Sequence, residues 1–140
     1  MKNYLNFLHS LAFGDALMLL VINGTKEEVI TGDEVDTKLQ ENVPEVPEKI
    51  RDAVSHIARG MGILVDAIIV DRNEKFIKMR STASRINLDM VIITLCNLFN
   101  ECNLDIPFEI TVSATQEETE RNNTIAIVIL ELTIWWVEQH

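Results

Sequence analysis

Cysteine, proline and glycine are scarce in this chain, which has two, three and five of them among its 140 residues. Cys96 and Cys102 lie six positions apart in a helical pattern, where their side chains point in different directions and cannot form a disulfide. A disulfide framework is therefore excluded, and a cytoplasmic location is expected. A signal peptide is not expected, because Asn6, His9 and Asp15 interrupt the apolar start of the chain.

Positive charge is also scarce, since 12 Lys and Arg residues stand against 22 Asp and Glu residues, giving a net charge of −10. This balance opposes association with nucleic acid or an anionic membrane, so neither is expected as a partner. A basic protein is the natural counterpart, although an acidic balance is also a common solubility device. The 47% content of hydrophobic residues fits one globular domain over residues 1–140.

Sequence motifs for chemistry are absent. The three histidines, His9, His56 and His140, have no metal-ligand spacing, and no Cys-x-x-Cys motif occurs, so neither a metal nor a cofactor is expected. His56 is one helical turn from Asp52, but no nucleophile follows from the spacing. A solvated helix face explains His56 better than catalysis, and no catalytic residue is assigned.

Hydrophobic periodicity predicts three helices in alternation with three hairpins. The helices are expected at 2–13, 47–59 and 88–102. The strands of the hairpins are expected at 16–22 and 25–31, at 63–70 and 75–80, and from 108 onward with the closing stretch. Residues 31–46 carry five acids against one lysine without clear periodicity, which predicts a loop.

This order predicts three αββ units in an α+β fold. Hairpins separated by single helices favour a mainly antiparallel sheet with the helices packed on one face.

The closing stretch, Thr124 to Val137, is the most apolar part of the chain and is predicted to be a strand because it contains eight β-branched residues. Its even positions, through Trp136, are expected to face the core. Its odd positions are also largely apolar, so both faces of this strand are expected to be buried. They are buried either by helices that cover a central strand or by the surface of another protein molecule. On the second interpretation the chain forms a homodimer through Glu131, Thr133, Trp135 and Val137.

One basic segment departs from the acidic trend. Residues 72–85 carry a charge of +4, and the stretch after Arg80 is expected to lead into a helix. Its hydroxyls and backbone NH groups would converge there with two arginines on one small anion, such as a nucleotide phosphate. The candidate ligand-binding residues are Arg80, Ser81, Thr82, Ser84 and Arg85. Ordinary helix capping is the competing explanation.

Two functional classes follow from these patterns. The first is a non-enzymatic protein-binding module, such as an inhibitor, an immunity protein or a chaperone-like accessory protein, that acts as a homo-oligomer through an acidic surface and its C-terminal strand. The alternative is a binder or sensor of a small anionic ligand at the Arg80–Arg85 segment.

Overall fold

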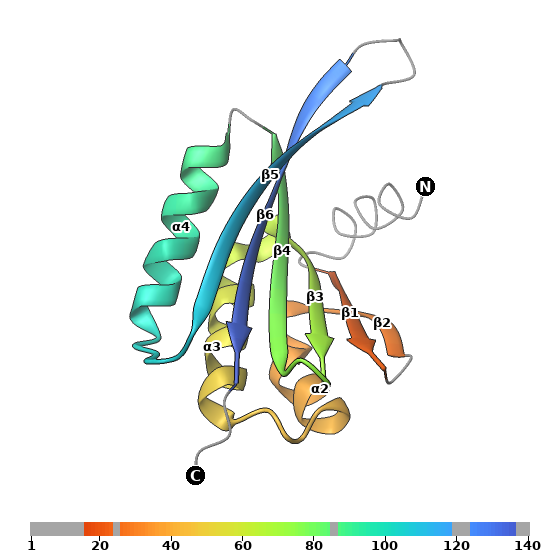
Figure 1. The fold of residues 1–140 in the computed structure, drawn as a ribbon, viewed down its shortest axis with the longest axis vertical. Helices are drawn as coiled ribbons and strands as arrows, with labels where there is room; N and C mark the ends of the chain where they lie inside the picture. Colours follow the sequence, from red (N-terminus) through yellow and green to blue (C-terminus); the bar gives the residue numbers. More distant parts are fainter. Residues whose placement is uncertain (1–15, 24–25, 85–86, 119–123, 137–140) are drawn as a thin grey trace.

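The computed structural model describes residues 16–23, 26–84, 87–118 and 124–136 (Figure 1). Its strands are β1 (Leu17–Ile22), β2 (Lys26–Ile30), β3 (Val65–Asp71), β4 (Phe76–Ser84), β5 (Phe108–Glu118) and β6 (Thr124–Trp135). Its helices are α2 (Val35–Asn42), α3 (Glu48–Met61) and α4 (Leu88–Glu101), with short 3-10 turns η1 (Gly32–Glu34) and η2 (Gly62–Leu64). The helix predicted at 2–13 lies outside the described residues.

The six strands form one sheet in the order β2-β1-β3-β4-β6-β5. The β1 and β3 strands run parallel, because the chain passes through α2 and α3 before it re-enters the sheet. The other neighbouring strands are antiparallel. The fold is therefore α+β with a mainly antiparallel sheet, as the sequence predicts.

The helices pack on one face of the sheet, with α4 lying alongside β5 (Figure 1). Helix α3 buries residues that recur every three or four positions, namely Ile50, Ala53, Val54, Ile57 and Met61. The strands bury the alternate residues that face these helices, including Leu19, Ile68, Ile77, Leu130, Leu132 and Ile134. Among the described residues, the opposite face of the sheet carries no helix. We call it the open face.

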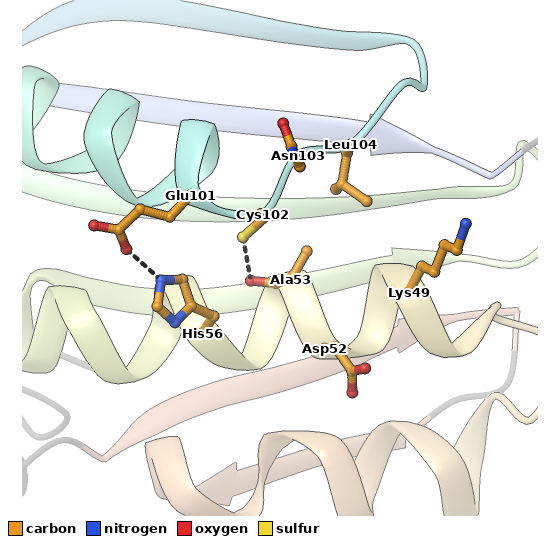
Figure 2. A pocket seen from close by; sticks show the side chains of 8 residues that line it. All are labelled: Lys49, Asp52, Ala53, His56, Glu101, Cys102, Asn103 and Leu104. Atoms are coloured by element: carbon orange, nitrogen blue, oxygen red, sulfur yellow. Dashed lines mark hydrogen bonds and ion pairs between the residues drawn. The ribbon is translucent and has the colours of Figure 1, made fainter.

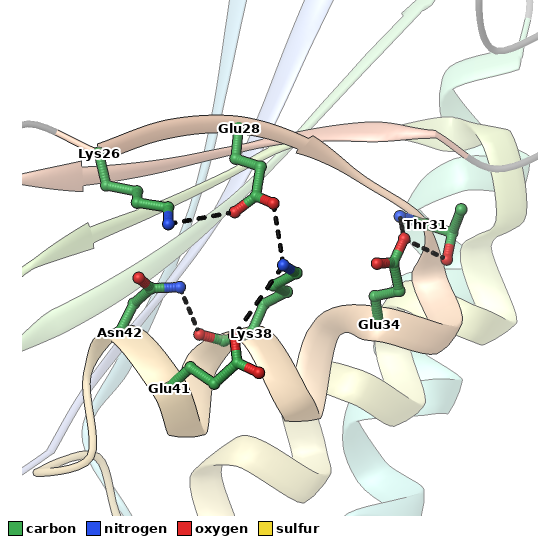
Figure 3. Close-up of polar contacts among 7 residues, drawn as sticks. All are labelled: Lys26, Glu28, Thr31, Glu34, Lys38, Glu41 and Asn42. Carbon is green, nitrogen blue, oxygen red and sulfur yellow. Dashed lines mark hydrogen bonds and ion pairs between the residues drawn. The ribbon is translucent and has the colours of Figure 1, made fainter.

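The prediction of a loop at 31–46 is wrong, because this segment contains η1 and α2. Val35, Leu39 and Val43 follow one another at intervals of four residues and are completely buried. This spacing is a helical signal, and the acidic residues between these positions obscured it. At the start of the segment, the Thr31 backbone NH and hydroxyl donate to Glu34 Oε1, each at 3.1 Å (Figure 3).

The other predicted elements agree with the structure except at one boundary. Helices α3 and α4 and the three hairpins are present, and Asn23 adopts the positive φ of 65° that its turn requires. Strand β4, however, continues to Ser84, so residues 81–84 are not a loop that leads into α4. The three αββ units are not confirmed, since two helices separate the first and second hairpins.

The closing stretch forms β6, an interior strand that pairs with β4 on one side and with β5 on the other. Its even positions from Val128 to Ile134 and the following Trp136 are buried toward the helices, as predicted. Its odd positions lie on the open face, where Thr133 is 6% exposed and Trp135 is half-buried. Val137 lies outside the described residues.

Candidate functional site

The open face has its densest group of aromatic and charged side chains on β4 and β6. The two strands pair in continuous register from Phe76 with Trp135 to Ser84 with Ile127. Ile77, Met79 and Ser81 of β4 are buried toward the helices, so the even residues of β4 lie on the open face, each opposite an odd residue of β6. We call six of these residues the β4–β6 strip: Phe76, Lys78, Arg80, Glu131, Thr133 and Trp135.

The two cations of the strip are paired with acids from the neighbouring strands. Lys78 Nζ lies 3.7 Å from Glu131 Oε2 on β6, and Arg80 Nε lies 3.4 Å from Asp66 Oδ1 on β3. Asp66 also accepts a hydrogen bond from the Thr82 hydroxyl. All these ion pairs are partly exposed to solvent, so each contributes little to stability by itself. Cations and anions alternate across the three strands, from Asp66 on β3 through Arg80 on β4 to Glu131 on β6.

An aromatic pair closes one end of the strip. The rings of Phe76 and Trp135 meet edge to face, with centroids 6.4 Å apart and an interplanar angle of 69°. Lys78 Nζ lies 5.5 Å from the centroid of the Phe76 ring, within the range of a cation–π interaction. The two adjacent tryptophans therefore lie in different environments, because Trp136 is buried in the core and Trp135 is half-buried on the open face.

The described residues of the expected anion site do not share one face of β4. Ser81 is buried on the helix-facing side and donates to the Leu64 carbonyl oxygen, whereas Arg80 and Thr82 lie on the open face and bind Asp66. Ser84 is exposed at the end of the strand, and Arg85 lies outside the described residues. Ser81 and Arg80 thus lie on opposite faces of the strand. On the open face, Arg80 and Thr82 both bind the carboxylate of Asp66.

A groove of about 400 Å³ lies between α3 and the C-terminal end of α4 (Figure 2). Across it His56 Nε2 lies 2.6 Å from Glu101 Oε2, so the partner of His56 is Glu101 and not Asp52. No spacing pattern signals this pair, because 45 residues separate the two in the sequence. Lys49 and Asp52 line the same groove.

The thiol in this groove, Cys102, is partly buried and hydrogen-bonded to the backbone. Cys102 Sγ donates to the Leu98 carbonyl oxygen at 3.2 Å. Burial raises the pKa of the Cys102 thiol, and the charge of Glu101 raises it further. The reactive thiolate is therefore less populated than in an ordinary cysteine. Among the described residues, no group of three His, Cys, Asp or Glu side chains could hold a metal ion.

Much of the acidic charge around α2 is already paired within the chain. Lys38 Nζ lies 2.9 Å from Glu28 Oε1, and Lys26 approaches the same carboxylate (Figure 3). The hydrogen bond with Lys38 lowers the pKa of Glu28 and raises that of Lys38. The other acids with a basic partner are Asp36 with Arg51, Glu41 with Lys38 and Glu45 with Arg72. These contacts leave less of the acidic segment for a basic partner than its composition suggests.

No helix in the described part of the chain has the length and apolar character of a membrane span. Comparison with protein-family models, with curated proteins and with solved structures finds no match to this chain. The fold defines a class only, an α+β domain whose described helices all cover the same face of the sheet. Function therefore has to be argued from the residues themselves.

Proposed function

We propose that this chain is a non-enzymatic protein-binding module that pairs with a second copy of itself through the β4–β6 strip. The observation that carries the proposal is the position of Trp135, which is half-buried on the open face and held edge to face by Phe76. Tryptophan and arginine are the side chains most enriched at the energetic centres of protein interfaces. The strip contains both, in Trp135 and Arg80.

The charges of the strip support a second copy as the partner. A two-fold axis places the same surface on both sides of an interface, so the surface must complement itself. Lys78 and Arg80 lie beside Glu131 and Asp66, and each cation can therefore face an anion of the other copy. An interface of this kind brings Glu131, Thr133 and Trp135 together with their counterparts, and Val137 is the next odd-numbered position in the sequence.

Binding without catalysis is the better interpretation of the remaining polar groups. The groove between α3 and α4 offers a hydrogen bond between His56 and Glu101 and a thiol whose pKa is raised. Neither provides an activated nucleophile.

Sedimentation velocity of the parent chain and of Trp135→Glu tests the proposal. We expect a concentration-dependent dimer for the parent and a monomer for the variant, because the substitution places an anion at the aromatic end of the strip, where the proposal puts the main apolar contact. Val29→Glu is the matched control, since Val29 is 45% exposed on the same face but lies on β2 at the far edge.

The control variant should sediment as the parent does, and circular dichroism should show that both variants are folded. Identical monomeric boundaries for all three proteins would remove the proposal. A dimer that survives Trp135→Glu would place the interface elsewhere.

A further inference from the structure

The two edges of the sheet are built very differently. Strand β2 has five residues, of which Lys26, Glu27 and Glu28 are charged, and ion pairs with Lys26 and Lys38 cover Glu28. Short length and charge are the usual means by which proteins keep an edge strand from pairing with another chain. The edge at β2 is therefore protected.

Strand β5, at the other edge, lacks these protections. It has eleven residues without proline, glycine, lysine or arginine, and its register with β6 runs from Phe108 to Glu118 without a bulge. The seven residues from Ile110 to Gln116 are uncharged, and those from 111 to 116 are all exposed. No described strand pairs with its outer side. Alternate NH and carbonyl groups of β5 thus point away from the sheet, where another strand can bind them.

The side chains of β5 add an apolar element to this edge. Phe108 and Val112 point to the helix side and are each 49% exposed. Part of the Phe108 ring contacts Phe99 of α4, with the two ring centroids 4.5 Å apart. An additional strand beside β5 would place its own alternate side chains about 5 Å from these residues. Apolar residues at those alternate positions would cover Phe108 and Val112.

We infer that β5 is a docking edge for an extended segment of another protein, with an apolar or β-branched centre and basic flanks. Recognition of this kind takes its affinity from backbone hydrogen bonds and its specificity from alternate side chains. The basic flanks follow from charge, because acids stand at both ends of β5, Glu109 at one and Glu117 and Glu118 at the other. A second copy is the weaker fit, since antiparallel pairing centred on Ser113 would oppose Glu109 and Glu117.

This inference rests on the proposed protein-binding role but uses a different surface from the β4–β6 strip. A labelled ten-residue peptide serves as the probe, with alternating valine and threonine in the middle and two lysines at each end. Fluorescence anisotropy should show saturable binding to the parent chain. We expect Val112→Lys to weaken binding at least tenfold, because it places a charge in the centre of the edge.

Val29→Lys is the matched control, because it makes the same substitution at a valine of similar exposure on the other edge strand. It should change the affinity less than twofold. N-methylation of alternate residues removes the NH donors along one edge of the peptide strand and keeps its charge and side chains. Two such peptides, each methylated along a different edge, are compared with the unmethylated peptide. The one whose methylated edge faces β5 should not bind. Amide hydrogen exchange should show added protection on β5 and none on β2.

Several results would overturn the inference. They are no binding of the parent at about 1 mM peptide, equal weakening by the two lysine variants, or equal binding of the peptide and both methylated forms. A parent dimer that Val112→Lys dissociates and Trp135→Glu leaves intact would assign the edge to a second copy instead. Trp135→Glu itself should bind the peptide as the parent does, so failure of the dimer proposal remains distinguishable from failure of this one.

Discussion

Replacement of Gly60 by alanine tests how closely α3 and α4 pack. A Cβ atom at this position would lie 2.5 Å from Leu98 Cδ2 and 2.6 Å from Leu98 Cδ1. Favourable contact between carbon atoms requires about 3.5 to 4.0 Å. The Leu98 side chain must therefore change its rotamer, or the two helices must move apart.

Two opposing effects decide the size of the change. Alanine is favoured over glycine within a helix by about 1 kcal/mol, and an added methyl group in a packed contact costs about 1 to 3 kcal/mol. The overlap involves the two terminal methyl groups of Leu98, a partly buried side chain that can turn aside, so we take the cost as about 2 kcal/mol, the middle of that range. We expect Gly60→Ala to lower the free energy of unfolding by about 1 kcal/mol, which corresponds to a decrease in Tm of about 3 °C for a chain of this size.

Urea unfolding of the parent, Gly60→Ala, Leu98→Ala and the double variant measures the coupling. Leu98→Ala removes both overlapping methyl groups, so in that background Gly60→Ala should instead raise the free energy of unfolding by about 0.5 to 1 kcal/mol. The sign of the effect thus reverses between the two backgrounds. Equal stabilisation in both would refute the reasoning, because it would mean that Gly60 does not contact Leu98.

Two further predictions concern the core and the pH dependence of stability. Ile134→Ala removes a completely buried side chain and should lower the free energy of unfolding by about 2 to 5 kcal/mol. Val112→Ala, at a half-exposed position, should change the free energy of unfolding by less than about 1 kcal/mol. Similar values for the two variants in urea titrations would contradict the burial assigned to these residues. Because Lys38 lowers the pKa of Glu28, this pair should stabilise the protein above the ordinary pKa of 4.5 and lose that effect as the pH falls through the lower folded value. Unfolding curves of the parent and Lys38→Met should therefore differ at pH 7 and converge in acid, and a difference independent of pH would count against the pair.

The sequence predicts most of the fold because the apolar residues of α3 and α4 follow the helical period, and because turn residues such as Asn23 separate the apolar or alternating runs of the strands. The two errors have physical causes. In α2 the helical period rests on Val35 and Leu39 alone, with Val43 after the helix, and polar residues fill the other positions. At the end of β4 the core-facing position is Ser81, whose hydrogen bond to Leu64 permits burial of a polar residue. An apolar pattern cannot reveal such a position.

The candidate surfaces were only partly predictable. Alternation along β6 placed Trp135 opposite the core-facing side chains, and this position could be read directly from the sequence. The ion pair between Arg80 and Asp66 could not be predicted from the sequence. Asp66 lies on a neighbouring strand, and the register of that strand with β4 depends on a bulge between Val65 and Ala67. The edge position of β5 was also hidden, since the order of strands in a sheet follows from long-range pairing.

The strand order has a consequence for biosynthesis. Strands β3 and β4, at the centre of the sheet, are joined by the short turn 72–75 and can pair as soon as both have left the ribosome. On the outer side of β4 the partner is β6, about fifty residues further along the chain. That side of the hairpin therefore stays without its strand until about fifty further residues have been made, and an unpaired strand edge exposed during this interval favours aggregation of the nascent chain.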